Sequence, residues 1–145
     1  MAKEIDPNAI VMTFKGIPIT GVADGTFVEV EYDEDAYTHH VGAQGTVTRV
    51  KNANEMGTVT FTLGQATLTN DRLSAVAIAD RVNGDGVGAL LIKDLKGTTL
   101  YMSQNAWIRK IAKGEHGKEH LNRSWVITCE KLKVMVGGST TPNAL

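Results

Sequence analysis

Residues 46–81 read TVTRVKNANEMGTVTFTLGQATLTNDRLSAVAIADR, and this stretch decides the fold class. Threonine and apolar side chains alternate over residues 58–63, which is typical of a strand with one buried face. That face consists of Val59, Phe61 and Leu63. From residue 73 the spacing becomes helical, and one stripe is predicted to pack on a sheet. The stripe consists of Leu73, Val76, Ala77 and Asp80.

The flanks of the alternating strand supply two further expectations. Residues 46–51 form another short strand pattern, and the Asn-rich segment 52–57 between the two strands is typical of a turn. We therefore expect a hairpin over residues 46–63. Residues 69–72 are of helix-capping types, and Asn83-Gly-Asp-Gly86 ends the helix.

Working outward, strand patterns recur on both sides of the helix. Residues 26–33 read TFVEVEYD, with an acidic face that cannot be core. Further strands are expected over residues 9–15, 87–93, 98–111 and 124–136. One helix on about seven strands indicates a mainly β fold, a β-sandwich or open barrel with one flanking α-helix.

The whole chain suits one domain over residues 1–145. Within it, residues 1–8 are expected to form an N-terminal arm, residues 33–45 a long loop and residues 137–145 a flexible tail. The formal net charge of -1 predicts no nucleic-acid patch. Cys129 is the single cysteine, so no disulfide within the chain is possible, and we expect it to be buried. No segment is long and apolar enough for a membrane span or a signal peptide.

No pattern argues for catalysis, a cofactor or a metal. His116 and His120 have a zinc-like spacing, but Gly117 weakens any helix there and no third ligand is indicated. The glycines of residues 83–88 follow a helix, whereas a phosphate cradle precedes one. The acids of residues 33–35 lack the ligand spacing of a calcium loop. We expect no catalytic, cofactor-binding or metal-binding residue.

The ordered pattern over residues 45–74 resembles the core of bacteriophage tail tube proteins. In that group a strand with a basic centre leads through an Asn-rich turn to a Thr-alternating strand, and an Asn-Asp link then enters the helix. The segment ITGVADGTFVEV at residues 19–30 and a late strand ending in Gly-Gly are also similar. The resemblance covers residues 9–136.

This resemblance implies a tail-tube-like β-sandwich with one flanking helix and a structural, non-enzymatic role. Six copies would form a ring whose inner sheets close into one barrel, and stacked rings would form the channel for DNA delivery. The implied partners are the chain itself, a contractile sheath, a baseplate and a tail terminator. Phage DNA would pass without specific binding, and no membrane is involved. The protein would be made in the host bacterial cytoplasm and reside in the virion tail.

Two sets of residues are expected to serve the assembly. The channel lining should be acidic or neutral, because phosphate-binding cations would stall DNA. The candidates for it are Glu29, Glu31 and Asp33 on one face, and Thr58, Thr60 and Thr62 on another. In the alternative, the acids face outside water or pair with Arg49 and Lys51 across a strand or subunit boundary. The candidate contacts between rings are Glu34, Asp35, Tyr37, His39 and His40.

Other functions remain open at this stage. The fold also serves type VI secretion tubes, so a secretion-system tube subunit is one alternative. A small β-barrel that binds nucleic acid or carbohydrate is another, and it would stay monomeric where a tube subunit self-associates. Ring number and helical parameters do not follow from the residues.

Overall fold

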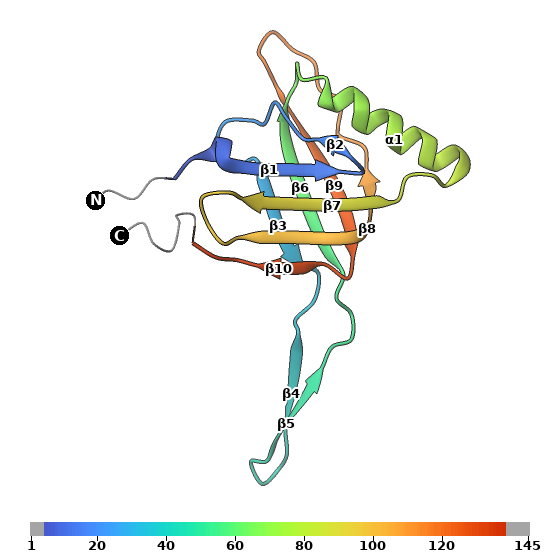
Figure 1. Cartoon of the computed structure of the whole chain (residues 1–145). Helices are drawn as coiled ribbons and strands as arrows, with labels where there is room; N and C mark the ends of the chain where they lie inside the picture. The colour runs from blue at the N-terminus through green and yellow to red at the C-terminus, as the bar shows by residue number, and fades with distance from the viewer. Residues whose placement is uncertain (1–4, 139–145) are drawn as a thin grey trace.

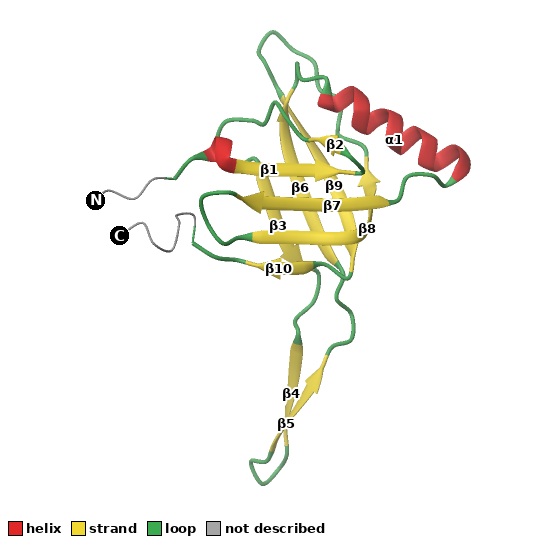
Figure 2. Cartoon of the chain, viewed as in Figure 1, coloured by secondary structure: helices red, strands yellow, loops and turns green. Residues whose placement is uncertain are grey.

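The computed structural model describes residues 5–138, and these are mainly β-structure with one α-helix (Figure 2). The expected mainly β fold with one flanking helix is therefore confirmed. The elements in chain order are η1 (Pro7–Ala9), β1 (Ile10–Phe14), β2 (Ile17–Pro18), β3 (Val28–Tyr32), β4 (Tyr37–Val41), β5 (Val47–Lys51), β6 (Gly57–Gly64), α1 (Thr69–Asn83), β7 (Gly88–Asp94), β8 (Leu100–Lys110), β9 (Asn122–Glu130) and β10 (Lys133–Met135).

Most strands belong to one eight-stranded sheet that is folded into two layers. The strand order is β2-β1-β7-β8-β9-β6-β3, and β10 also pairs with β8. In Figure 1, β1, β7 and β10 run across the view, whereas β3, β6 and β9 cross behind them. The long strand β8 belongs to both layers, because its first part pairs with β7 and β10 and its second part pairs with β9.

The core lies between the two layers. Phe14, Leu90 and Ile92 face it from the layer of β1 and β7. Phe61 and Trp125 face it from the other layer and pair directly across β6 and β9. The alternation of β6 is as expected, since Val59, Phe61 and Leu63 are all fully buried.

The helix α1 lies against one end of the sandwich and contacts β2 and β8 (Figure 1). Its residues Leu73 and Ala77 are buried, as the helical spacing of the sequence predicts. Its start differs from expectation, because no side chain caps it. Instead the Asn70 amide donates to the Gly64 carbonyl oxygen at 2.9 Å, and its Oδ1 accepts from the buried Trp125 indole at 2.9 Å. Asn70 thus connects the helix to both β6 and β9.

The expected hairpin over residues 46–63 is wrong. Strand β5 pairs antiparallel with β4, and β6 pairs with β3 and β9. The segment 33–45 is therefore not a long loop, because its residues 37–41 form β4. Both strands exist, but β5 pairs with β4, to which the turn at residues 42–46 joins it, and not with β6.

The last expected strand is also interrupted. Residues 124–136 divide into β9 and β10 at Lys131, which has a positive φ of 47°. The kink lets both pieces pair with β8 as that strand passes between layers. Of the expected C-terminal tail, Gly137 is held by the Thr99 hydroxyl, which donates to the Gly137 carbonyl oxygen at 3.1 Å and accepts from the Gly137 amide at 3.0 Å. Residues 139–145 lie outside the described part. The expected N-terminal arm is described only from residue 5, with η1 at its end.

Candidate assembly surfaces

The two candidate channel faces are one continuous surface. Strand pairing sets Glu29 opposite Thr60 and Glu31 opposite Thr58, and paired residues share a face of the sheet. The Thr58 hydroxyl also donates to the Asp33 carboxylate at 2.6 Å. This surface is the side of β3, β6 and β9 that points away from the core. We call it the outer face of the β6 layer.

The outer face of the β6 layer continues across the next two strands. Thr58 pairs with Thr128 of β9, and Thr128 pairs with Trp107 of β8. Thr60 pairs with Val126, which pairs in turn with Lys110. No sequence pattern signals this continuation, because it depends on which strands become neighbours. The face is therefore acidic at one edge, rich in threonine in the middle and basic at the other edge.

A two-stranded hairpin made of β4 and β5 projects from the sandwich (Figure 1). All the residues in its two strands are exposed, including Val41, Val47 and Val50. An isolated two-stranded hairpin is only marginally stable in water, and its bare edges and apolar side chains favour a further partner. Nothing in the described part of the chain covers it.

The basic residues of β5, Arg49 and Lys51, lie on the hairpin. The Arg49 guanidinium lies over the Tyr37 ring, 4.0 Å from its centroid. Lys51 pairs with Tyr37 across the two strands. Both cations therefore belong to the hairpin, and within one molecule they are not strand neighbours of Glu29 or Glu31, which lie on β3.

The base of the hairpin is held by Asn52. Its side-chain amide donates to the Glu34 carboxylate at 2.7 Å and to the Asp35 carbonyl oxygen at 3.1 Å. Hydrogen bonds from Asn52 and then from Asn54 lower the pKa of Glu34 below its usual value. Two of the five candidate inter-ring residues thus shape the base of the hairpin, and the other three lie on β4. Those three are Tyr37, His39 and His40.

The remaining polar features do not form a reactive site. No group of three or more potential metal ligands exists among residues 5–138. Burial, with a smaller effect of the Asp33 charge, raises the pKa of the Cys129 thiol to about 12, so it is protonated at neutral pH. No helix of the described residues is long and apolar enough to cross a membrane.

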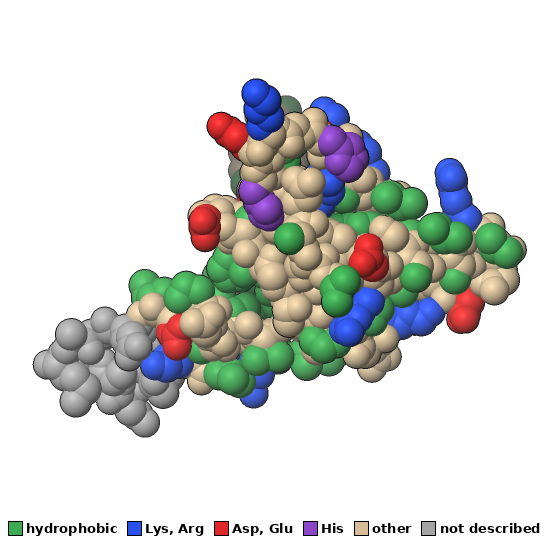
Figure 3. All heavy atoms as spheres, turned by 90° about the horizontal axis from the view of Figure 1, so that it is seen from above, with side chains coloured by type: hydrophobic (Ala, Val, Ile, Leu, Met, Phe, Trp, Pro, Cys, Tyr) green, Lys and Arg blue, Asp and Glu red, His purple; other side chains and the backbone are tan. Residues whose placement is uncertain are grey.

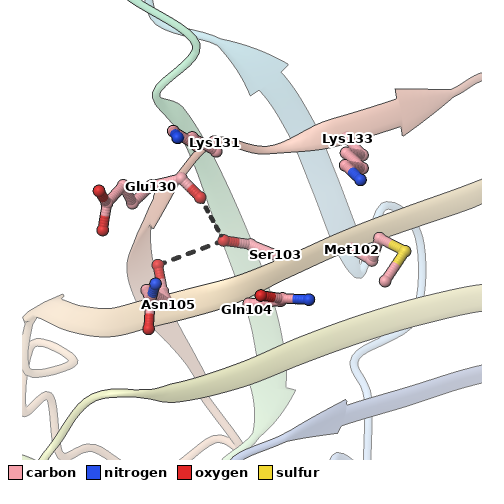
Figure 4. Close-up of a pocket in the computed structure, with 7 residues that line it drawn as sticks. All are labelled: Met102, Ser103, Gln104, Asn105, Glu130, Lys131 and Lys133. Atoms are coloured by element: carbon pink, nitrogen blue, oxygen red, sulfur yellow. Dashed lines mark hydrogen bonds between the residues drawn. The ribbon is translucent and has the colours of Figure 1, made fainter.

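A pocket lies at the bend of β8, where a buried hydroxyl forms hydrogen bonds with backbone carbonyl oxygens. Its lining residues are labelled in Figure 4 and come from β8, from the end of β9, from Lys131 and from the start of β10. The buried Ser103 hydroxyl donates to the Glu130 carbonyl oxygen at 2.6 Å and contacts that of Asn105 at 3.2 Å. The hydroxyl is thereby occupied with two carbonyl oxygens of the backbone where the strands part.

Comparison with known proteins identifies the family of this chain. A model of the bacteriophage PhiTE tail tube protein family matches residues 12–137. The chain belongs to this family. It is also 37% identical over 123 residues to structural protein ORF10 of Pseudomonas phage KPP10, covering 83% of this chain and 71% of that protein. Membership confirms the expected resemblance, a structural rather than enzymatic role, and a place in the virion tail.

Solved structures show the same fold at low sequence identity. The cap of the anti-feeding prophage, a tube terminating cap, matches with a TM-score of 0.60, 8% identity and 93% coverage of both chains. A sheath/tube terminator of an extracellular contractile injection system matches with a TM-score of 0.58 and 9% identity, covering 93% of this chain and 99% of that one. A chain of the sheath-tube complex of such a system matches with a TM-score of 0.51 and 12% identity, covering 93% and 90%. These three likenesses establish the fold of this tail tube protein.

Proposed function

We propose that this tail tube protein is the repeated subunit of a channel for DNA delivery, built from stacked six-membered rings. The hairpin of β4 and β5 is the observation that carries the proposal. It exposes three valines that no described residue of the same molecule covers, although an apolar surface of this kind needs a partner. Family membership supplies the assembly in which identical copies provide that partner.

The hairpin is assigned to the contact between rings. It projects past the end of the sandwich, so it reaches beyond the body of its own subunit (Figure 1). Tyr37, His39 and His40 present aromatic and imidazole groups along β4, and Glu34 with Asp35 fixes the base. A strand pair with bare edges can also add main-chain hydrogen bonds to a neighbouring sheet.

The outer face of the β6 layer is assigned to the channel lining. Three threonines cover its middle, and they offer neutral hydroxyls that bind phosphate weakly compared with lysine or arginine. Glu29, Glu31 and Asp33 lie at its edge and repel the DNA backbone. Away from its basic edge at Lys110, a lining of this kind lets DNA slide without specific binding.

The opposite layer then faces outward, where further tail proteins would bind. Its exposed side carries Leu91, Lys93 and Lys133 on β7 and β10. One structural neighbour comes from a sheath-tube complex and another is a sheath/tube terminator. We accordingly assign a contractile sheath to this side, a tail terminator to one end of the tube and a baseplate to the other.

Negative-stain microscopy of the concentrated protein tests the proposal. Six domains of this size around a channel give rings or tubes about 80–100 Å wide, scaled from single-domain dimensions. Rings or tubes of that width support the assignment. Particles that stay monomeric at every concentration would instead favour a small binding module.

A further inference from the structure

The layer of β1 and β7 carries a surface patch on the side that points away from the core. Strands β1, β7, β8 and β10 are neighbours in this layer, and every second residue of each strand points outward. The strand register arranges these residues in two rows. One row is Thr13, Leu91, Met102 and Lys133, and the other is Val11, Lys93, Leu100 and Met135. We call these eight residues the outer patch.

The outer patch is largely apolar and open to solvent. Val11, Leu91 and Met135 are 40%, 39% and 59% accessible. Leu100 and Met102, both on β8, are half-buried. Along the lower rim of Figure 3, which is the side of β1 and β7, apolar and basic side chains lie next to one another. Apolar side chains in adjacent positions on an exposed face indicate a binding surface.

The charge of the outer patch is positive. Its charged members are Lys93 and Lys133, which are both exposed. Neither lysine is in an ion pair among residues 5–138. The pocket of Figure 4 adjoins the patch at Met102 and Lys133, and its acid, Glu130, lies on the far side of the pocket from Lys133. A partner that complements this surface therefore brings carboxylates.

Backbone pairing determines the kind of element that can cover the outer patch. Strand β7 lies between β1 and β8, and the first part of β8 lies between β7 and β10. The backbone groups at the centre of the patch are thus already paired, and no further strand can add there. The partner must satisfy its own backbone groups, which a helix does within its own chain. Helices are also common covers for the apolar face of a sheet.

The dimensions of the outer patch set the length of such a helix. Neighbouring strands lie about 4.8 Å apart, so each row of four residues is about 14 Å long. Two residues along a strand separate the two rows by about 7 Å. A helix laid along the rows covers them with about ten residues, since each residue adds about 1.5 Å.

We propose that the outer patch binds an acidic amphipathic helix of another tail protein. The apolar stripe of that helix packs on Leu91, Leu100 and Met102, and its carboxylates pair with Lys93 and Lys133. Methionine suits such a surface, because its flexible side chain adapts to the shape of a partner. The inference rests on the proposed function, which turns this layer outward, and it specifies the chemistry of the partner on that side.

A designed peptide tests this recognition. The probe is a fluorescent helix of about 15 residues with leucine along one face, glutamate on its flanks and alanine elsewhere. Fluorescence anisotropy should show that it binds the wild type. Lys93→Glu with Lys133→Glu should weaken binding by about tenfold, because two attractions become repulsions. The same variant should gain binding to a peptide with lysine in place of glutamate, and a misfolded chain could not produce this gain.

Two further variants complete the test. Leu91→Ser with Met102→Ser should weaken binding of the acidic peptide, because the apolar contact is lost. Arg72→Glu with Lys118→Glu reverses two exposed charges outside the patch and should bind the acidic peptide like the wild type. Equal binding of the acidic and the basic peptide to the wild type, or no binding of either, would overturn the inference. Stronger binding to phosphatidylglycerol vesicles than to the peptide, or self-association of the wild type that Leu91→Ser with Met102→Ser abolishes, would assign the patch to a different occupant and overturn it too.

Assembled rings separate this inference from the proposed function. Rings should bind the acidic peptide as single chains do, because the patch stays on their outside. Rings that form normally while neither they nor single chains bind the peptide would overturn the inference alone. Peptide binding by single chains that is lost in rings would show that the layer does not face outward, which contradicts both. Chains that bind the peptide but never form rings would overturn the proposed function and leave the recognition chemistry supported.

Discussion

Deleting the hairpin of β4 and β5 should separate stability from assembly. The strands that flank it are already neighbours, since the Asp33 amide donates to the Met56 carbonyl oxygen at 3.0 Å. Replacing residues 35–53 by Gly-Gly therefore closes β3 and β6 through a short loop. The change removes three candidate inter-ring residues on β4 together with Asp35 and leaves the core intact.

The expected effect on folding is small. All residues of the two hairpin strands are exposed, so almost no apolar burial is lost. The segment between Asp33 and Met56, which this hydrogen bond closes, shortens from about 22 residues to about five. The shorter loop lowers the entropic cost of closure by about 1 kcal/mol. We expect the free energy of unfolding to stay within about 1 kcal/mol of the wild type.

The expected effect on assembly is large. Single rings should still form, but negative-stain images should show no stacked tubes. A second variant keeps the full length: Val47→Asp with Val50→Asp charges the exposed apolar residues and should also prevent stacking. Val47→Ile with Val50→Ile preserves their character and serves as the matched control. Tubes of normal length from the deleted chain would refute the assignment of the hairpin, and a chain that no longer folds would refute its independence from the core.

Three further outcomes follow from the packing. Phe61→Ala should destabilise the domain by about 3–5 kcal/mol in denaturant unfolding, because it leaves a cavity between the layers; a loss below about 1 kcal/mol would contradict the core assignment. Asn70→Ala should cost about 1–3 kcal/mol, since the buried Trp125 indole loses its acceptor, while the exposed Asn83→Ala should change little. Cys129 should react with a thiol reagent only after unfolding, and rapid labelling of the native protein would show that the strand opens.

Local patterns in the sequence were sufficient for most elements. The alternation over residues 58–63 and the helical spacing from Leu73 to Ala77 depend on neighbours within a few positions, and the structure has β6 and α1 at those places. A mainly β fold with one helix follows from the sum of such patterns. The family resemblance rested on the same residues.

The pairing of strands could not be predicted in the same way. The exposed strand β4 reads YTHHV and lacks a buried face, so its sequence shows no alternation of polar and apolar residues and predicts a loop. The break at Lys131 depends on the need of β10 to follow β8 into the other layer. Glu31 and Thr58 lie on one face because of the register in which β3 pairs with β6, and a short sequence pattern does not determine that register.

Cryo-microscopy of the assembled tube tests the central claim most directly. We expect the reconstruction to place Thr58, Thr60 and Thr62 on the wall of the channel. A reconstruction with these threonines on the outer wall of the tube would contradict the account.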